Sequence, residues 1–381
     1  MTPAAWETLV SAWSLPRYRG RQIFDAIHRR LAREYAGMQV LPGPLRERLE
    51  REAPIYFPEV ARREEAADGS VKLGLRMADG ALIEAVFMPG EARVSLANEF
   101  ADARADARLA TRDSRQGGKP TAPTEPFTIC LSSQTGCAVD CAFCVTGRLG
   151  AGRNLTAGEI VGQLYAVLHE VGRTFEGMRL VFMGMGEPLL NLEGVLPALE
   201  ILFEEISPRR VTVSTSGITT ALAPLAAMTR RPNLAVSLNA ADEATRTRLM
   251  PITRTYPLPD LVRAMRAWPL EPRRRILVEY VLIAGVNDSP EDASQLVRLL
   301  RGLPVKVNVI PLNEDPVYLP GWKRPEEGAI DRFVGVLAEA RTTVTVRRSK
   351  GPDASAACGQ LKGRTVNPRG RVRSQESGAR K

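Results

Sequence analysis

The chain has 381 residues but only two histidines and five cysteines, and it has no long apolar run. No stretch approaches the roughly 18 consecutive apolar residues that a membrane-spanning helix needs. The first residues, Met1–Trp6, contain no basic region followed by an apolar stretch, so we expect no secretory signal. An odd and small number of cysteines in so long a chain argues against a disulfide framework and favours the reducing cytoplasm. We therefore expect a cytoplasmic protein that does not enter a membrane.

Positive charge is in excess, with 52 Lys and Arg against 43 Asp and Glu and a formal net charge of +9. Such a balance suits a polyanionic partner, because basic side chains that neutralise phosphates release counterions. Many arginine-rich proteins are basic without binding nucleic acid. The charge alone therefore leaves a nucleic-acid partner open.

Composition and hydrophobic pattern divide the chain into four parts. The first contains helical patterns and then alternating runs, with a hairpin signal at Asp79-Gly80, and we expect a small α+β accessory domain. The second is low in complexity and typical of a flexible linker or insertion. The third is the core, and the fourth is a basic tail that we expect to be disordered. The predicted boundaries are 1–95, 96–125, 126–362 and 363–381.

The core alternates apolar runs with helical patterns, as expected for parallel strands joined by right-handed crossovers. The predicted strands are Phe127–Leu131, Leu180–Met183, Arg210–Ser214, Leu234–Leu238, Ile276–Ile283 and Val305–Ile310. The helical patterns between them begin near Thr156, Leu192, Thr219, Ala241, Leu258 and Pro290, and a last helix and strand follow at Ile330–Ala340 and Thr342–Arg347. Six units fall short of a closed eight-unit barrel. We therefore expect an α/β fold with a partial (β/α)6, TIM-like barrel.

Three cysteines after the first predicted core strand carry the strongest chemical signal. Cys137, Cys141 and Cys144 form C-x3-C-x2-C, and three thiolates on one short loop can hold three irons of a [4Fe–4S] cluster, leaving the fourth iron open. Zinc is the alternative, but it usually needs a fourth Cys or His nearby. Both His28 and His169 lie in helical patterns that favour a surface or packed residue, so the spacing favours iron and sulfur.

Short polar and glycine-rich motifs follow the other predicted strands. They are therefore expected at the carboxyl ends of the strands, where the active sites of parallel barrels lie. Taken singly, each is ambiguous. The glycines can simply form turns, Glu187 can bind an amine or pair with an arginine, and Ser214 and Asn313 can be caps or ligand contacts. These words are Gly184–Pro188, Ser214–Gly217, Ser237–Ala240 and Asn308–Asn313.

The three-cysteine loop resembles the radical S-adenosylmethionine (SAM) superfamily, and several longer words resemble the RlmN/Cfr family of adenine methyltransferases within it. The resemblance covers the chain from about residue 12 to 362, except the 90–125 segment. The matching words are Arg17–Phe24, Cys130–Cys137, Arg153–Gln163, Gly184–Asn191, Ser214–Gly217 and Asp353–Leu361. The resemblance implies methylation of an adenine in 23S rRNA, at C2 in the RlmN branch, which also modifies tRNA, and at C8 in the Cfr branch.

The same resemblance assigns roles residue by residue. Cys137, Cys141 and Cys144 would hold the cluster, whose open iron binds SAM and cleaves it to a 5′-deoxyadenosyl radical. Cys358 would accept a methyl group from a first SAM, and the radical from a second SAM would activate that methyl for addition to adenine. Cys130 would resolve the covalent RNA–protein adduct, leaving a Cys130–Cys358 disulfide. Glu84 would be the proton acceptor, although without the resemblance it would be taken as an exposed strand residue.

The resemblance also implies the ligand contacts and partners. RNA would bind the N-terminal domain and basic residues of the rim, with the target adenine turned out of its stack. An electron donor would reduce the cluster, and nothing in the sequence requires more than a monomer. The expected SAM contacts are Gly186, Glu187, Ser214, Ser237, Leu238, Asn239 and Asn313.

Two departures from the family pattern and two rival functions remain. Asn239 stands where many relatives have His, and the 90–125 segment is longer than the usual link, which weakens the placement of Glu84. Gly186-Glu187-Pro188 and Thr215-Ser216-Gly217 resemble the C2 enzymes more than the C8 enzymes. A non-catalytic RNA-binding protein with a structural cluster is the other rival, but it would need neither Cys130 nor Cys358.

Overall fold

The computed structural model describes residues 1–90, 125–347 and 359–362. The predicted tail over 363–381 and nearly all of the predicted linker over 96–125 lie outside these residues. In the part of the chain that is described, none of the helices combines the length and the apolar character needed to cross a membrane.

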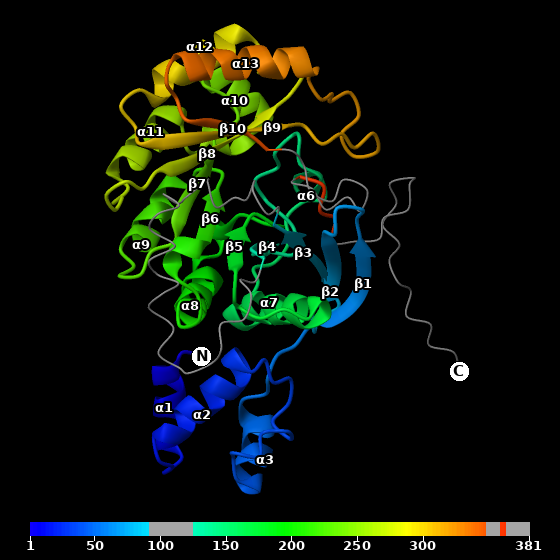
Figure 1. Ribbon diagram of the computed structural model, residues 1–381, viewed down its shortest axis with the longest axis vertical. Helices are drawn as coiled ribbons and strands as arrows, with labels where there is room; N and C mark the ends of the chain where they lie inside the picture. The colour runs from blue at the N-terminus through cyan, green and yellow to red at the C-terminus, as the bar shows by residue number, and fades with distance from the viewer. Residues whose placement is uncertain (91–124, 348–358, 363–381) are drawn as a thin grey trace, which may run out of the picture.

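The N-terminal helices form a small cluster below the main sheet (Figure 1). Thr2 accepts a hydrogen bond from Ala5 at the start of the first helix, as an N-cap residue does. Gly20 allows the first two helices to cross closely, because a Cβ atom at Gly20 would lie 2.5 Å from the nitrogen of Glu7. The elements are α1 (Pro3–Ala12), α2 (Tyr18–Phe24), a π-helical turn (Asp25–Arg29) and α3 (Gly43–Glu52).

One ten-stranded sheet runs through the rest of the molecule in the order β1 to β10. The first three strands pair antiparallel with their neighbours, β3 pairs antiparallel with β4, and β4 to β10 are parallel. The sheet is therefore continuous across the boundary predicted near residue 95, and its two ends are not joined. The strands are β1 (Glu59–Glu65), β2 (Val71–Arg76), β3 (Leu82–Pro89), β4 (Phe127–Cys130), β5 (Met178–Phe182), β6 (Val211–Thr215), β7 (Asn233–Ser237), β8 (Ile276–Leu282), β9 (Val305–Pro311) and β10 (Val344–Val346).

Helices follow the outer side of the curved sheet (Figure 1). Helix α7 begins with a capping box in which Thr156 and Glu159 exchange hydrogen bonds, and Ser289 and Asp292 do the same at α12. The α-helices are α6 (Val145–Arg148), α7 (Ala157–Val171), α8 (Leu192–Leu202), α9 (Leu222–Ala226), α10 (Glu243–Leu249), α11 (Leu258–Ala267), α12 (Pro290–Leu300) and α13 (Glu327–Glu339). Short 3-10 turns lie at Pro188–Leu190, Pro208–Arg210, Thr219–Ala221 and Pro251–Arg254. The predicted open α/β barrel is confirmed, with each predicted core strand present.

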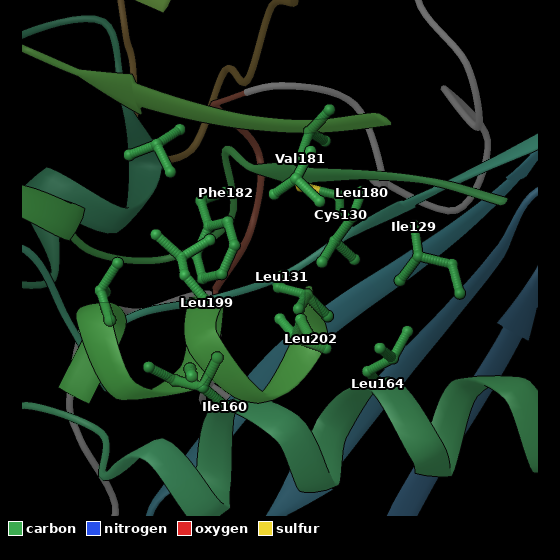
Figure 2. Packing of buried hydrophobic residues seen from close by; sticks show 14 of the residues in the cluster. Ile129, Cys130, Leu131, Ile160, Leu164, Leu180, Val181, Phe182, Leu199 and Leu202 are labelled. Atoms are coloured by element: carbon green, nitrogen blue, oxygen red, sulfur yellow. The ribbon is translucent and has the colours of Figure 1, made fainter. Parts of the chain in front are cut away.

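The core lies between the strands and the helices. Figure 2 shows Ile160 and Leu164 of α7 and Leu199 and Leu202 of α8 beneath the strands, and all four are buried or nearly so. Side chains alternate across a strand, so Cys130 lies on the opposite face from Ile129, beside Val181 of β5 (Figure 2). This second face is the interior of the barrel.

Two turns set the positions of the first core strands. The predicted hairpin at Asp79-Gly80 joins β2 to β3: Gly80 has a positive φ of 82°, and the Asp79 carboxylate accepts from the nitrogen of Ala81 at 3.0 Å. At the far end of β3, the nitrogen of Gly90 donates to the carbonyl of Pro126 at 2.8 Å. The chain therefore leaves β3 and enters β4 at neighbouring points.

Candidate active site

A cavity of about 1010 Å³, including its open mouth, lies at the carboxyl ends of strands β5 to β9. Its lining contains most of the residues predicted from the sequence: Cys137, Cys141, Cys144, Gly186, Glu187, Ser214, Ser237, Asn239 and Asn313. Of the other predicted residues, Leu238, Cys130 and Glu84 do not line it, and Cys358 lies outside the described residues. The side chain of Leu238 is fully buried in the core.

The loop that carries the cysteines is fixed by buried amides. The side-chain amide of Gln163 on α7 bonds both backbone groups of Ser132. It accepts from the Ser132 nitrogen at 2.9 Å and donates to the Ser132 carbonyl at 2.7 Å. Asn191 donates to the carbonyls of Ser133 and Leu155 at 2.7 and 2.8 Å. Because buried polar groups are costly unless they are paired, this network holds the start of the loop in one conformation.

The three thiols suit a cluster better than a single ion. Among the described residues, no three His, Cys, Asp or Glu side chains come close enough together to hold one metal ion. In a [4Fe–4S] cluster each thiolate binds a different iron, so the sulfurs need only surround a shared space. Cys137, Cys141 and Cys144 line one cavity and therefore meet this requirement. Burial raises the pKa of Cys137 to about 12, so binding iron would displace the thiol protons.

Glu187 follows β5 and is almost completely buried. One carboxylate oxygen accepts from the nitrogen and the hydroxyl of Ser216, both at 2.7 Å, and the other accepts from the nitrogen of Leu189 at 3.0 Å. Burial raises the pKa of Glu187, and the hydrogen bonds from Ser216 and Leu189 oppose that shift. The side chain of Thr215 is a further hydrogen-bond partner of Glu187, so the carboxylate is fixed at the cavity wall by several neighbouring groups.

Asn239 lies after β7 in a left-handed backbone conformation, with φ of 61°. Its side-chain oxygen accepts from the nitrogen of Val281 at 2.8 Å, and its side-chain nitrogen lies 3.1 Å from the sulfur of Met250. Asn tolerates positive φ better than most residues. The residue that departs from the family pattern therefore connects the ends of β7 and β8 and also lines the cavity.

Glu84 is buried, not exposed, on β3. Arg62 of β1 forms an ion pair with it at 2.8 Å, reaching across the position of Gly74, which lies opposite Glu84 on β2. Its second carboxylate oxygen accepts from the backbone nitrogen of Lys362 at 2.9 Å. Val86 lies opposite Cys130, so Glu84 and Cys130 are diagonal neighbours on the interior face.

The segment Gly359–Lys362, beside α6 in Figure 1, is attached to several elements at the cavity mouth. The carbonyl of Gly359 accepts from the nitrogen of Val145 at 2.8 Å, and the carbonyl of Leu361 accepts from the Thr146 hydroxyl at 2.7 Å. The Lys362 ammonium forms an ion pair with Asp315 at 3.0 Å. Gly359 and Leu361 also line the cavity.

Sequence reasoning missed Arg246, the largest fully buried side chain of the described residues. It is on α10 and donates to carbonyls at the ends of β6 and β7. The available signal is its position three residues before Leu249, on the face of the helix that packs inward.

Comparison with known proteins agrees with this geometry. The sequence model of the Radical SAM superfamily matches residues 131–297. The chain is 40% identical over 384 residues to the dual-specificity RNA methyltransferase RlmN of Anaeromyxobacter dehalogenans (strain 2CP-C), with 97% of this chain and 93% of the relative covered. It is 42% identical to the protein of the same name from Geotalea uraniireducens (strain Rf4), with 94% of each chain covered. The chain belongs to the RlmN family.

A solved structure supports the same assignment. The crystal structure of a radical SAM methyltransferase from Sphaerobacter thermophilus is 40% identical in sequence and superposes with a TM-score of 0.81. The alignment covers 96% of this chain and 98% of that protein. Membership of this radical SAM family implies a [4Fe–4S] cluster and SAM as cofactors, and the three-cysteine cavity is where the described residues can accommodate them.

Proposed function

We propose that this protein is a radical SAM methyltransferase that methylates C2 of adenine 2503 in 23S rRNA, and an adenine of tRNA. The observation that carries the proposal is the near full-length match to dual-specificity RNA methyltransferases in a chain whose three-cysteine cavity is complete. An external one-electron donor is required to reduce the cluster. The proposal needs no more than one copy of the chain.

Different residues of the cavity bind the cluster and SAM. Cys137, Cys141 and Cys144 hold the cluster, which when bound supplies the electron that cleaves SAM. Glu187 lies at the cavity wall, where its carboxylate can accept a hydrogen bond from the SAM amine. The surrounding contacts with SAM come from Gly186, Ser214, Ser237, Asn239 and Asn313, which line the cavity, and from Leu238, which lies between two of them in the sequence.

The C-terminal anchor supports the role of Cys358. Gly359, its immediate neighbour in the chain, is hydrogen-bonded to Val145, which directly follows Cys144. Gly359 also lines the cavity, which supports a role for Cys358, the residue before it in the sequence, in the chemistry of this site. Its thiolate displaces the methyl group of a first SAM, and a second SAM is consumed when that methyl is activated and added to adenine.

Cys130 and Glu84 complete the proposed chemistry. The radical adduct would give up its unpaired electron to the cluster, and Glu84 would accept the proton lost from C2. The Cys130 thiolate would then attack the Cys358 sulfur and break its bond to the methylene carbon, which takes up a proton to become the methyl group of the product. The product leaves, and a Cys130–Cys358 disulfide remains that a dithiol must reduce. The diagonal placement of Glu84 and Cys130, together with the bond from Lys362 to Glu84, supports their action on one substrate.

Nucleoside mass spectrometry tests the proposal. The protein is reconstituted anaerobically with iron and sulfide and incubated with SAM, a reductant and unmodified 23S rRNA or tRNA. We expect 2-methyladenosine in the digest. The 8-isomer would move the protein to the C8 branch, and absence of both isomers with an intact cluster would contradict the proposal.

Two cysteine variants test the order of steps. Cys130→Ala should accumulate a covalent RNA–protein adduct, detected as a shifted band that nuclease removes. Cys358→Ala should form neither adduct nor product while RNA binding is unchanged. If Cys358→Ala still methylates RNA, the methyl-cysteine route is wrong.

A further inference from the structure

Arg246 is a buried cation, and none of the residue roles implied by the family resemblance involves its charge. Its side chain is fully buried, and it does not line the cavity. Its guanidinium donates to the Ser216 carbonyl at 2.6 Å, the Leu238 carbonyl at 3.1 Å and the Thr253 hydroxyl at 2.8 Å, with a longer contact to Ser237. All these acceptors are neutral.

No carboxylate of the described residues forms an ion pair with Arg246. Glu243, one turn earlier on α10, opposes the lowering of the Arg246 pKa, but it is exposed and its carboxylate accepts from the nitrogen of Leu258. Burying a charge without a counterion is costly even when its hydrogen bonds are satisfied. The fold therefore holds a positive charge here for which the described residues offer no close anion.

The position of Arg246 indicates that its counterion is a group bound in the cavity. Two of its acceptors, Ser216 and Ser237, belong to residues that line the cavity, so the guanidinium lies directly behind the cavity wall. The same helix meets the cluster loop, because the nitrogen of Ala142 donates to the Leu249 carbonyl at 2.9 Å. Burial lowers the pKa of Arg246 to about 10, and Cys141 is close enough for its interaction with the guanidinium to oppose this shift.

A cluster held by three thiolates carries net negative charge, and one-electron reduction adds to it. Net charge near the cluster is one of the factors that set its reduction potential. A fixed cation in a water-poor wall favours the more negative, reduced state, because charges inside a protein are weakly screened. All four hydrogen-bond acceptors of Arg246 are protein atoms, so it acts through its field and not by ligand contact.

We propose that Arg246 is the buried countercharge of the cluster and raises its reduction potential. This inference rests on the proposed function only in requiring that the cysteines hold a cluster. It makes Arg246 a positioning and tuning residue, not a catalytic one.

The test is a redox titration of the reconstituted cluster, followed by electron paramagnetic resonance, in the full-length protein. In Arg246→Met, the ratio of reduced to oxidised cluster at the wild-type midpoint should fall about tenfold, which for one electron is a shift of ~59 mV to more negative potential. Arg246→Lys keeps the charge and should stay near the wild-type midpoint. If Arg246→Met does not fold, Arg246→Gln replaces it, since its amide can still donate to the carbonyls.

Two matched controls separate charge from structure. Arg248→Met removes an exposed arginine from the same helix, and Thr253→Val removes one hydrogen-bond acceptor of Arg246 without changing charge. Neither should move the midpoint. An unchanged midpoint in Arg246→Met, or an equal shift in Arg246→Lys, would overturn the inference. If the wild-type protein does not bind a cluster, that result would instead contradict the proposed function.

Discussion

Asn239 is held in a backbone conformation that few side chains adopt. Asn239→Ala would lose both the tolerance for positive φ and the hydrogen bond to Val281. We expect the free energy of unfolding to fall by about 1–3 kcal/mol. Denaturant unfolding of the protein measures this, and Asn239→Gly separates the causes, because glycine accepts the backbone conformation without restoring the bond. Equal stability of the alanine variant and the wild type would contradict the assignment.

Gly74 provides the space through which Arg62 reaches Glu84. A Cβ atom at Gly74 would lie 3.2 Å from the Cβ of Arg62, so Gly74→Ala should displace the arginine and leave Glu84 without its closest ion pair. Lys72, at 3.6 Å, and the backbone nitrogen of Lys362 still contact Glu84, so we expect a loss of only about 1 kcal/mol in stability, the usual contribution of one hydrogen bond, together with a lower rate of methylation. Gly37→Ala is the control, because no atom lies within 4 Å of a Cβ there. A fully active Gly74→Ala protein would show that the Arg62 contact is dispensable.

Individual residues were predictable to different degrees. The cysteine spacing predicts the cluster ligands, because the ligands of one cluster lie on one short loop, and the structure brings these three cysteines to one cavity. Their role as ligands stays a prediction. The burial of Glu84 could not be predicted, since its partners Arg62 and Lys362 are far away in the sequence. Arg246 was missed for the same reason. Its acceptors include backbone carbonyls of distant residues, and every residue has a backbone carbonyl, so no residue type in the sequence indicates them.

The π-helical turn Asp25–Arg29 attaches the N-terminal helices to α7 through a buried hydrogen bond between His28 and Tyr165. Burial lowers the pKa of His28 from 6.5 to about 3, so the folded protein keeps it neutral. The unfolded chain binds a proton below about pH 6.5, whereas the folded chain does not until about pH 3. Stability should therefore fall as pH decreases through this window, by about 1.4 kcal/mol per pH unit from this group.

Thermal unfolding at several pH values tests the contribution of His28. In His28→Gln the part of the pH dependence due to this group should disappear. The exposed His169 is the matched control, because it is the other histidine of the chain, and His169→Gln should keep the wild-type slope. Parallel curves for wild type and His28→Gln would contradict a neutral buried histidine.

Elements with an apolar pattern were predicted, and those without one were not. The six core strands and their helices are confirmed to within a few residues. Strand β1 was not predicted, because Glu-Val-Ala-Arg-Arg-Glu-Glu has no apolar alternation and its side chains are mostly exposed at the sheet edge. The strand forms because its backbone pairs with β2, and its own sequence pattern does not indicate this pairing.

The whole molecule carries an excess of positive charge, which yields a prediction about RNA. If basic residues bind phosphates, the affinity for 23S rRNA fragments should fall at least about tenfold between roughly 50 and 200 mM salt. Fluorescence anisotropy with labelled RNA measures the slope. An affinity that does not change with salt would mean that the net charge of +9 plays no part in binding.

Domain organisation was the hardest property to derive. The composition changes near residue 95 and predicts a boundary there, yet β3 and β4, on either side of it, are hydrogen-bonded neighbours in one sheet. Local composition cannot reveal a pairing between strands that a long segment separates. The three predicted boundaries themselves stay predictions.

The hydrogen bond from Gly90 to Pro126 has a consequence for how this enzyme can change over evolution or in the laboratory. The two ends of the 91–124 segment are fixed side by side, so the sheet does not depend on how many residues join them. The entropy of closing a loop grows only with the logarithm of its length. A fluorescent reporter or an affinity module of similar end spacing could therefore replace this segment, while a short hairpin could delete it, with the cysteine cavity left unaltered.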